Sequence, residues 1–533
     1  MNDQINWEIG RRRTFAIISH PDAGKTTLTE KLLLYGGALR LAGTVKSRKS
    51  KQYAVSDWME IEKQRGISIT SSALQFEYNG HKINILDTPG HQDFCEDTYR
   101  TLMAADSAVM LIDAAKGVEE QTKKLFKVCR DKGIPIFTFI NKLDREGRMP
   151  LDLIDELEKL LGIRSYPMNW PVGLGKDFKG IYDRLSERII LFDDASRGKT
   201  IVPTKSGDLR DPNFTANIDE QLLAQLEEDI GLLSIAGDQF DPQLVASGQQ
   251  TPIYFGSALT NFGVSNFLDS FINLAPAPHD RQTSGGKLQP QNQEFTGFVF
   301  KIQANMNPAH RDRIAFIKIC SGVFNRGMVV KHVPSGKKVR LAQSKQLFGQ
   351  DSETLDQAYP GDIIGITDTG IFSIGDTLTE KSNFEFEPIP TFLPEHFARI
   401  QLKDAMKRKQ FVKGVNQLTQ EGAVQKYSEL NIGIEAPIVG AVGTLQFEVL
   451  LHRLTAEYGV DVTINYLPYS VSRWVQGKPE AINKLNQSDV MVVKNDHQQY
   501  LALFRNEWSL RWEVDNNTDL EFLETPPPIV YAS

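Results

Sequence analysis

The sequence predicts a multidomain protein: an α/β P-loop domain with an inserted subdomain is followed by a β-barrel domain and an α+β domain. Three observations carry this prediction: buried apolar runs that alternate with helical stretches, a proline-containing linker, and short strands beyond that linker. The chain has 533 residues. At about 100–200 residues per domain, that length accommodates three or four domains.

The first half of the chain carries apolar runs typical of buried strands. They are Phe15–Ile18, Ile83–Leu86, Ala108–Ile112, Ile134–Ile140 and Ile253–Phe255. Most are continuous rather than alternating, as expected of strands buried on both faces of a parallel sheet. Helical stretches lie between several of them, including one after Lys25 and one after Pro150. This alternation predicts a doubly wound α/β domain.

A long spacer and a linker divide the chain further. Roughly 110 residues separate Asp144 from Ile253, whereas a crossover between strands needs only about 10–12. The excess predicts an inserted subdomain at about 150–250, with a strand at Arg188–Phe192 and an acidic helix around Ile218–Leu233. Two prolines stiffen the start of the linker at 275–278, and glycines are expected to loosen it at 284–286.

Beyond the linker the pattern changes to short strands separated by turns. The candidate strands are Phe295–Ile302, Ile314–Ile319, Met328–Lys331, Asp362–Ile366 and Ile374–Leu378. This spacing favours a β-barrel. Helical and strand patterns mix after about residue 388, with a helix expected at Gln446–Tyr458. We therefore predict domains at 1–279, 280–388 (linker and barrel) and 389–533.

Composition excludes several classes of protein. The formal charge of −7 gives no global attraction for nucleic acid, and no DNA partner is expected. No apolar run approaches the roughly 20 residues that span a bilayer, so no membrane partner is expected. Three widely spaced cysteines form no disulfide framework, and the apolar run after Arg11-Arg12-Arg13 is too short for export. A cytoplasmic location follows as an expectation.

The first chemical motif lies between a predicted strand and a predicted helix. It reads Ser19-His20-Pro21-Asp22-Ala23-Gly24-Lys25-Thr26. Backbone N–H groups in such a loop form an anion site with the helix N-terminus. Lys25 is expected to reach the β- and γ-phosphates of a nucleotide, and the Thr26 hydroxyl to ligate Mg²⁺. The motif departs from the usual pattern in beginning with Ser19 instead of glycine.

A second motif follows the strand Ile83–Leu86 and reads Asp87-Thr88-Pro89-Gly90-His91. Asp87 stands where a carboxylate holds Mg²⁺ through water. The Gly90 N–H is expected to meet the γ-phosphate, because glycine lets the backbone approach closely.

A third motif, Asn141-Lys142-Leu143-Asp144, follows the strand Ile134–Ile140. Asp144 is able to accept hydrogen bonds from the ring N–H and the exocyclic amine of guanine, a pair that adenine does not offer. Asn141 and the stem of Lys142 are expected to support the base. All three motifs follow predicted strands at their carboxyl ends, where α/β sheets bind ligands, and together they predict a site for GTP or GDP with Mg²⁺.

Further segments resemble the translational GTPase superfamily, of the elongation factor G type. Gln64–Thr70 resembles its switch I, which usually has threonine at the place of Ser68, and Asp87–His91 resembles its switch II. Ser257-Ala258-Leu259 resembles its last guanine-contacting loop. Within the superfamily, the chain is most similar to the bacterial peptide chain release-factor GTPases. The segments that carry this similarity are 19–27, 56–60, 64–69, 298–306 and 440–447.

The resemblance implies a mechanism and partners. Ser68 would bind Mg²⁺ in place of the family threonine, and His91 would be catalytic by positioning the attacking water. Hydrolysis of GTP to GDP and phosphate would depend on the ribosome, through its RNA and proteins, and would promote departure of the decoding release factors after peptide release. Two basic clusters are candidates for contact with RNA. They are Arg399, Lys403, Lys407, Arg408, Lys409 and Lys413, expected on one helix, and Lys46, Arg48, Lys49 and Lys51.

Other functions remain compatible with the motifs. Translocation or ribosome protection fits the same superfamily, but few residues follow the barrel for the further domains of such factors. A GTP-binding switch outside translation is not excluded by the nucleotide motifs. A P-loop kinase or ATPase is the weakest alternative, because the segment 141–144 selects guanine.

Overall fold

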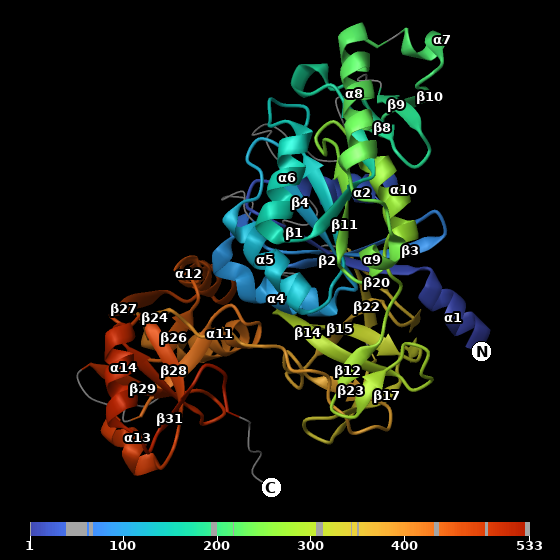
Figure 1. Ribbon diagram of the computed structural model, residues 1–533. Helices are drawn as coiled ribbons and strands as arrows, with labels where there is room; N and C mark the ends of the chain where they lie inside the picture. Colours follow the sequence, from blue (N-terminus) through green and yellow to red (C-terminus); the bar gives the residue numbers. More distant parts are fainter. Residues whose placement is uncertain are drawn as a thin grey trace.

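The computed structural model places three domains side by side (Figure 1). It describes residues 2–38, 61–62, 68–192, 200–216, 218–304, 313–342, 344–348, 351–430, 436–485 and 489–527. The α/β domain lies at the top of the view, the barrel at the lower right and the third domain at the lower left. Among these residues, no helix combines the length and apolar character needed to cross a bilayer.

The α/β domain is built on a seven-stranded sheet with the order β2-β3-β1-β4-β5-β11-β6. Its strands are β1 (Arg12–Ser19), β2 (Ser72–Tyr78), β3 (His81–Asp87), β4 (Ser107–Asp113), β5 (Ile136–Asn141), β6 (Arg164–Pro167) and β11 (Gln250–Phe255). All neighbours are parallel except β2 and β3. The five predicted apolar runs are confirmed as β1, β3, β4, β5 and β11. Neither edge strand, β2 or β6, was predicted; the four residues of β6 contain no apolar run and end in proline.

Helices cover both faces of this sheet, as predicted for a doubly wound domain. They are α2 (Lys25–Tyr35), α4 (Cys95–Ala104), α5 (Glu120–Asp131), α6 (Pro150–Leu161) and α10 (Val264–Leu274). Apolar residues of α2 and α10 pack into one core, whereas those of α4, α5 and α6 pack into another. A short helix, α1 (Asn2–Gly10), precedes β1 at the outer edge of the domain (Figure 1).

The inserted segment forms a small antiparallel sheet at the top of Figure 1. Its strands are β7 (Asn169–Val172), β8 (Gly180–Asp183), β9 (Arg188–Phe192) and β10 (Thr204–Asp208). Its helices are α7 (Pro212–Thr215), α8 (Glu220–Ala236) and α9 (Pro242–Ala246). Both predicted elements are present, as β9 and α8. Helix α8 is fastened to the sheet by Trp170 Nε1, which donates to Asp229 Oδ2 at 2.9 Å.

The second domain is a barrel-like antiparallel sheet with the order β18-β17-β23-β14-β15-β22-β19-β20. Its strands are β14 (Thr296–Ala304), β15 (Arg313–Ser321), β17 (Val329–His332), β18 (Lys338–Arg340), β19 (Ser344–Phe348), β20 (Asp351–Thr354), β22 (Ile363–Asp368) and β23 (Thr377–Thr379). A separate pair joins β16 (Phe324–Asn325) to β21 (Gln357–Ala358).

The predicted loose linker is wrong in its second part. Residues there form a hairpin of β12 (Arg281–Thr283) and β13 (Gly286–Leu288). Arg281 donates to the Met103 and Ala105 carbonyls at 2.8 and 3.0 Å and pairs with Asp106 at 2.9 Å. These long-range contacts fix the segment against the α/β domain, and a glycine-rich composition does not reveal them.

The third domain has an eight-stranded sheet with helices α11, α12, α13 and α14. The sheet order is β27-β24-β26-β25-β29-β30-β28-β31. The strands are β24 (His396–Leu402), β25 (Gln425–Glu429), β26 (Ile438–Ala441), β27 (Val462–Leu467), β28 (Val471–Gln476), β29 (Val490–Lys494), β30 (Tyr500–Phe504) and β31 (Glu521–Leu523). The helices are α11 (Arg408–Gln420), α12 (Leu445–Tyr458), α13 (Pro479–Leu485) and α14 (Glu507–Asn516). The predicted α+β class is confirmed, and the predicted helix at 446–458 is α12.

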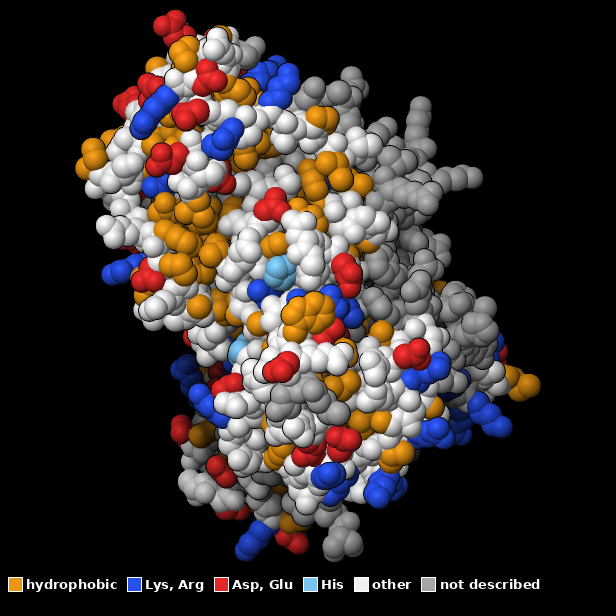
Figure 2. Space-filling view, turned by 90° about the vertical axis from the view of Figure 1, so that its right-hand side faces the viewer, with side chains coloured by type: hydrophobic (Ala, Val, Ile, Leu, Met, Phe, Trp, Pro, Cys, Tyr) orange, Lys and Arg blue, Asp and Glu red, His pale blue; other side chains and the backbone are white. Residues whose placement is uncertain are grey.

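Figure 2 shows the side of the molecule that faces away from the third domain. Acidic and basic side chains are interspersed over most of this side, as expected for a chain with a formal charge of only −7. Among the described residues on this side, Lys and Arg do not form the broad basic surface that binds nucleic acid backbones.

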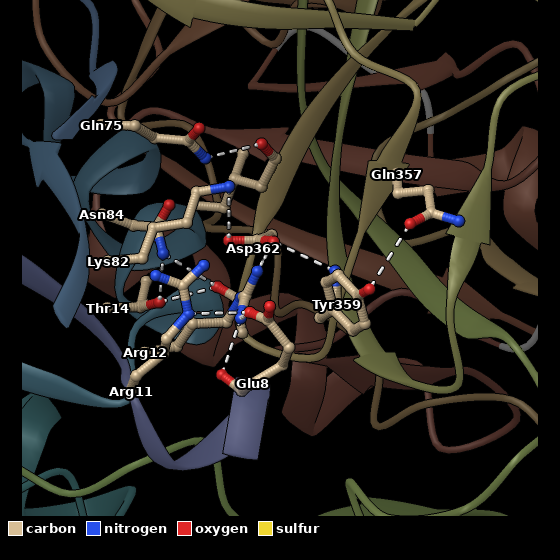
Figure 3. A network of polar contacts seen from close by, with 12 residues as sticks. Glu8, Arg11, Arg12, Thr14, Gln75, Lys82, Asn84, Gln357, Tyr359 and Asp362 are labelled. Atoms are coloured by element: carbon tan, nitrogen blue, oxygen red, sulfur yellow. Dashed lines mark hydrogen bonds and ion pairs between the residues drawn. The ribbon is translucent and has the colours of Figure 1, made fainter. Parts of the chain in front are cut away.

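A buried polar network joins the α/β domain to the barrel (Figure 3). Arg12 is 2 % exposed and pairs with Asp362 at 2.8 Å and with Glu8. Thr14 Oγ1 donates to the Gly361 carbonyl at 2.7 Å. Burial alone would raise the pKa of Asp362, but the charges of Arg12 and Lys82 outweigh it and hold that pKa below its usual value. Through this network the barrel docks near the amino ends of β1 and β3.

Candidate nucleotide-binding site

The carboxyl ends of the parallel strands border a cavity of about 500 Å³. Open α/β sheets bind ligands at this edge. Residues from the ends of β1, β3, β4, β5 and β11 and the loops that follow them, from helix α2 and from the segment before β2 line the cavity. They are Ser19, His20, Pro21, Asp22, Gly24, Lys25, Thr26, Thr27, Lys31, Ser68, Gly90, His91, Asp113, Lys116, Asn141, Lys142, Asp144, Arg145 and Leu259.

The loop between β1 and α2 is shaped by Gly24. Its φ of 100° lies in the left-handed region, which a residue with a Cβ atom enters only at a cost. A Cβ atom at this position would also collide with Asn141 Nδ2. Helix α2 begins at Lys25 with no side-chain cap on its first amides. These N–H groups therefore suit an anionic group at the helix N-terminus.

Oxygen ligands suited to Mg²⁺ gather beside this helix. Thr26 Oγ1 and Ser68 Oγ lie 3.5 Å apart, and Lys25 Nζ lies 3.0 Å from Asp87 Oδ1. The other carboxylate oxygen, Asp87 Oδ2, is buried and has no hydrogen-bond partner in the described chain. Mg²⁺ prefers hard oxygen ligands and keeps several waters. The two hydroxyls and the unpartnered carboxylate oxygen fit such an ion.

Asn141 ties together two loops that border the cavity. Its Nδ2 donates to the Ala23 carbonyl at 2.8 Å, and its Oδ1 accepts from the Ala258 amide at 2.8 Å. Lys142, with a left-handed φ of 69°, pairs with Asp113 at 2.7 Å and donates to the Asp22 carbonyl. Burial alone would raise the pKa of Asp113, but the hydrogen bond from Lys142 lowers it below its usual value.

Asp144 is oriented by the loop after β11. Ser257 Oγ donates to Asp144 Oδ1 at 2.6 Å, which fixes the carboxylate at the cavity wall. Ser257 is itself held by paired backbone hydrogen bonds with Phe262 at 2.9 and 3.1 Å. Leu259, from the same loop, is 40 % exposed and lines the cavity. A fixed carboxylate beside an apolar side chain suits a planar base that carries N–H donors.

His91 also lines the cavity, at the N-cap of the short helix η1 (Gln92–Phe94). Its Nδ1 is 3.3 Å from the Asp93 amide and 3.1 Å from Asp93 Oδ1, so Asp93 engages this nitrogen and leaves Nε2 outside that contact. The segment before it is anchored by Thr88 Oγ1, which donates to the Ile17 carbonyl at 2.6 Å.

The structure brings most of the predicted site residues to the cavity surface. Seven predicted residues are not among those that line the cavity: Ala23, Asp87, Thr88, Pro89, Leu143, Ser257 and Ala258. Five lining residues were not predicted from the sequence: Thr27, Lys31, Asp113, Lys116 and Arg145. Asp113 directly follows the predicted strand Ala108–Ile112, and this position at the carboxyl end of a strand could have identified it as a site residue. The switch I residues 64–67 and the basic cluster of Lys46, Arg48, Lys49 and Lys51 lie outside the described residues.

The predicted helix carrying six basic residues is wrong. Arg399 lies in β24, Lys403 in a loop and Lys407 in the short helix η4 (Ala405–Lys407). Only Arg408, Lys409 and Lys413 belong to α11. The break has a local cause, because the Asp404 side chain accepts from the Met406 amide and starts η4.

The fold and this site together define a translational GTPase. The family described as "Elongation factor Tu GTP binding domain" matches residues 10–277, and "Elongation factor G domain 2" matches residues 294–381. "Class II release factor RF3, C-terminal domain" matches residues 386–514. A crystal structure of a Thermus thermophilus protein has a TM-score of 0.70 and 20% identity, covering 91% of this chain and 73% of that one, which supports the fold.

Relatives over nearly the whole chain specify the family. "Peptide chain release factor 3" of Symbiobacterium thermophilum is 57% identical, covering 98% of this chain and 99% of the relative. The protein of the same name from Listeria monocytogenes is 54% identical at the same coverage, and that of Gloeobacter violaceus is 52% identical over 99% of both chains. The chain belongs to the peptide chain release factor 3 family.

Proposed function

We propose that this chain is a ribosome-dependent GTPase that promotes dissociation of the decoding release factors from the ribosome after peptide release. One observation carries the proposal: a guanine-type site is joined directly to a third domain of the release-factor type. The Leu445 amide at the start of α12 donates to Asp93 Oδ2 at 2.9 Å, two residues after His91. The third domain therefore contacts the switch II segment beside the nucleotide cavity.

Nucleotide binding is assigned to the three loops already described. Lys25 exchanges its contact with Asp87 for the β- and γ-phosphates, and the α2 amides hold the phosphate chain. Asp144 accepts the two N–H donors of guanine, while Asn141 and Lys142 hold the surrounding loops. Thr26 and Ser68 would ligate Mg²⁺, with Asp87 acting through water. When bound, this ion neutralises charge on the β- and γ-phosphate oxygens.

His91 is assigned to position the attacking water. Asp93 holds one of its ring nitrogens, and the other is able to orient a water toward the γ-phosphate. His91 lines the cavity with its ring partly exposed, so an external group has access to it. Ribosomal RNA phosphate is the proposed external group, and its arrival accounts for stimulation by the ribosome.

The proposed partners are the ribosome, through its RNA and proteins, and the decoding release factors, all in the cytoplasm. Lys403, Arg408, Lys409 and Lys413 have exposed side chains around the start of α11. Such a cluster suits a phosphate backbone, because bound cations are released when it docks.

A release complex tests the proposal. Ribosomes carrying a labelled decoding release factor after peptide release are mixed with the protein and GTP. We expect the labelled factor to leave faster than without the protein, and His91→Ala to turn over slowly. Departure at the same rate with and without the GTP-bound protein would contradict the proposal.

A further inference from the structure

All three domains meet directly after Ser68, the switch I serine. The amides of Ile69 and Thr70 donate to Glu62 Oε1 at 2.9 and 3.1 Å. The amide of Ser71 donates to Asp97 Oδ2 at 2.7 Å. Three consecutive backbone groups are therefore held by carboxylates. Because residues 69–71 directly follow Ser68, their position determines where Ser68 lies relative to the Thr26 hydroxyl, which is assigned to the metal.

The third domain covers the same segment with an apolar cluster. Its buried members are Ile61, Ile69, Phe94 and Val449. Val449 comes from α12 of the third domain, whereas the other three belong to the α/β domain. We call this cluster and the polar groups around it the three-domain junction.

The barrel enters the junction through one lysine. Lys301 of β14 is 5 % exposed, and its Nζ donates to the Ser71 carbonyl and to Ser71 Oγ, the latter at 3.1 Å. Burial lowers the pKa of this ammonium, although the nearby carboxylates of Asp97, Glu62 and Glu421 favour its charge.

An apolar side chain of similar length would fill this space without desolvating a charge. What lysine adds is a donor that reaches the backbone three residues after Ser68. That contact spans 230 positions in the sequence and links the barrel to switch I.

We propose that Lys301 is a positioning residue for the triphosphate state: by holding Ser71 it keeps Ser68 beside Thr26, so the barrel raises the affinity for GTP relative to GDP. The γ-phosphate and its metal ion order switch I in GTPases, and the diphosphate does not require that order. A contact made only in the ordered state adds affinity only for the ligand that selects this state. The inference rests on the proposed function, which assigns Ser68 to the metal.

Lys318 offers a matched control. It lies on the neighbouring strand β15, is 1 % exposed and also points from the barrel into the α/β domain. Its Nζ donates to Asp106 Oδ2 at 2.8 Å and to the Gly361 carbonyl at 3.0 Å, among residues outside the switch segments. Replacing it disturbs the same domain interface without touching Ser71.

The test compares Lys301→Met with Lys318→Met in the full chain. Fluorescent GDP and a non-hydrolysable GTP analogue are titrated with Mg²⁺ present and without ribosomes. We expect Lys301→Met to lower the affinity for the GTP analogue about tenfold, within the usual range of coupling between sites. The affinity for GDP should stay unchanged. Lys301→Arg should recover part of the loss. Lys318→Met should not change the ratio of the two affinities.

The inference would be overturned if Lys301→Met lost affinity equally for both nucleotides or lost no affinity at all. If that variant does not fold, Ser71→Ala removes one acceptor of the same lysine and should weaken the analogue selectively by about two- to threefold, as loss of one hydrogen bond does. An unchanged ratio there overturns the inference as well. A selective loss in a protein that ribosomes fail to stimulate would support this inference and contradict the proposed function.

Discussion

The nucleotide cavity and the three-domain junction lie next to each other, yet they are built differently. The cavity is formed by short loops whose residues are contiguous in the sequence, with backbone amides and glycine turns as its main groups. The junction combines a buried apolar cluster with buried charged side chains from all three domains. Its contacts between domains join residues that are 117 to 352 positions apart. Local sequence therefore specifies the loops of the nucleotide cavity, whereas tertiary packing specifies how these loops contact the barrel and the third domain.

The largest expected effect is on the stability of the junction. Arg453 of α12 is 2 % exposed and pairs with Glu421 at 2.6 Å and with Glu457 at 2.6 Å. Arg453→Leu leaves Glu421 buried without its cation, and we expect a loss of about 3–5 kcal/mol in the free energy of unfolding. Denaturant unfolding measures the loss. Nucleotide affinity should be retained wherever the variant is folded.

A matched control for this prediction is Arg473→Leu in the same domain. Arg473 pairs with Glu524 at 3.4 Å, and that carboxylate is largely exposed. Exposed pairs contribute only about 0–1 kcal/mol. If the two arginine variants lose similar stability, the contrast between buried junction and open surface is not supported.

The next largest effect is on nucleotide affinity and concerns the cavity alone. Gly24→Ala places a Cβ atom against Asn141 Nδ2 in a left-handed backbone, and we expect nucleotide affinity to fall about 100-fold, from strain and loss of loop geometry together. Isothermal titration with GDP checks this. Gly37→Ala, at the other end of α2, has a φ of 70° but no atom near its Cβ position. It should keep its affinity, and a similar loss there would assign the effect to backbone strain alone.

Guanine selection gives a third prediction within the cavity. Asp144→Asn replaces a two-fold acceptor with one acceptor and one donor. GTP should bind about 100-fold more weakly, because a charged hydrogen bond is lost and a donor faces a donor. Xanthosine triphosphate, which presents a carbonyl in place of the exocyclic amine, should bind better than GTP. Unchanged preference for GTP in competition titrations would remove Asp144 from the base site.

The smallest effect concerns acid stability at the network in Figure 3. The pKa of Asp362 is lowered in the folded protein from 3.8, so the folded state binds fewer protons there than the unfolded state. The carboxylate therefore contributes stability above pH 3.8 that is lost as pH falls toward its folded pKa. Asp362→Asn should flatten the dependence of unfolding free energy on pH in this acid range. An unchanged slope would show that other carboxylates carry it.

These differences explain what the sequence was able to predict. Continuous apolar runs specified five strands of the central sheet, because strands buried on both faces need such residues. The motifs at 19–26, 87–91 and 141–144 led to one cavity because each follows a strand in a parallel sheet. Edge strands β2 and β6 and the hairpin β12–β13 were missed, since pairing and long-range contacts form them.

The junction was beyond sequence reasoning for a related reason. A lysine within the apolar strand β14 looks like an outward-facing residue, and only the folded chain brings Lys301 to Ser71. The basic residues between 399 and 413 were assigned to one helix on charge alone. The cap formed by Asp404, visible in the sequence as a turn-forming residue, divides them.

Phosphate release from GTP, measured with and without ribosomes, tests the central claim most directly. We expect ribosomes to accelerate release at least ~10³-fold, the scale on which external groups activate GTPases. His91→Ala should lose this acceleration while keeping its affinity for GDP, because the His91 ring contacts Asp93 and is assigned to the attacking water, not to the base or the diphosphate. A rate that ribosomes leave unchanged would contradict the account.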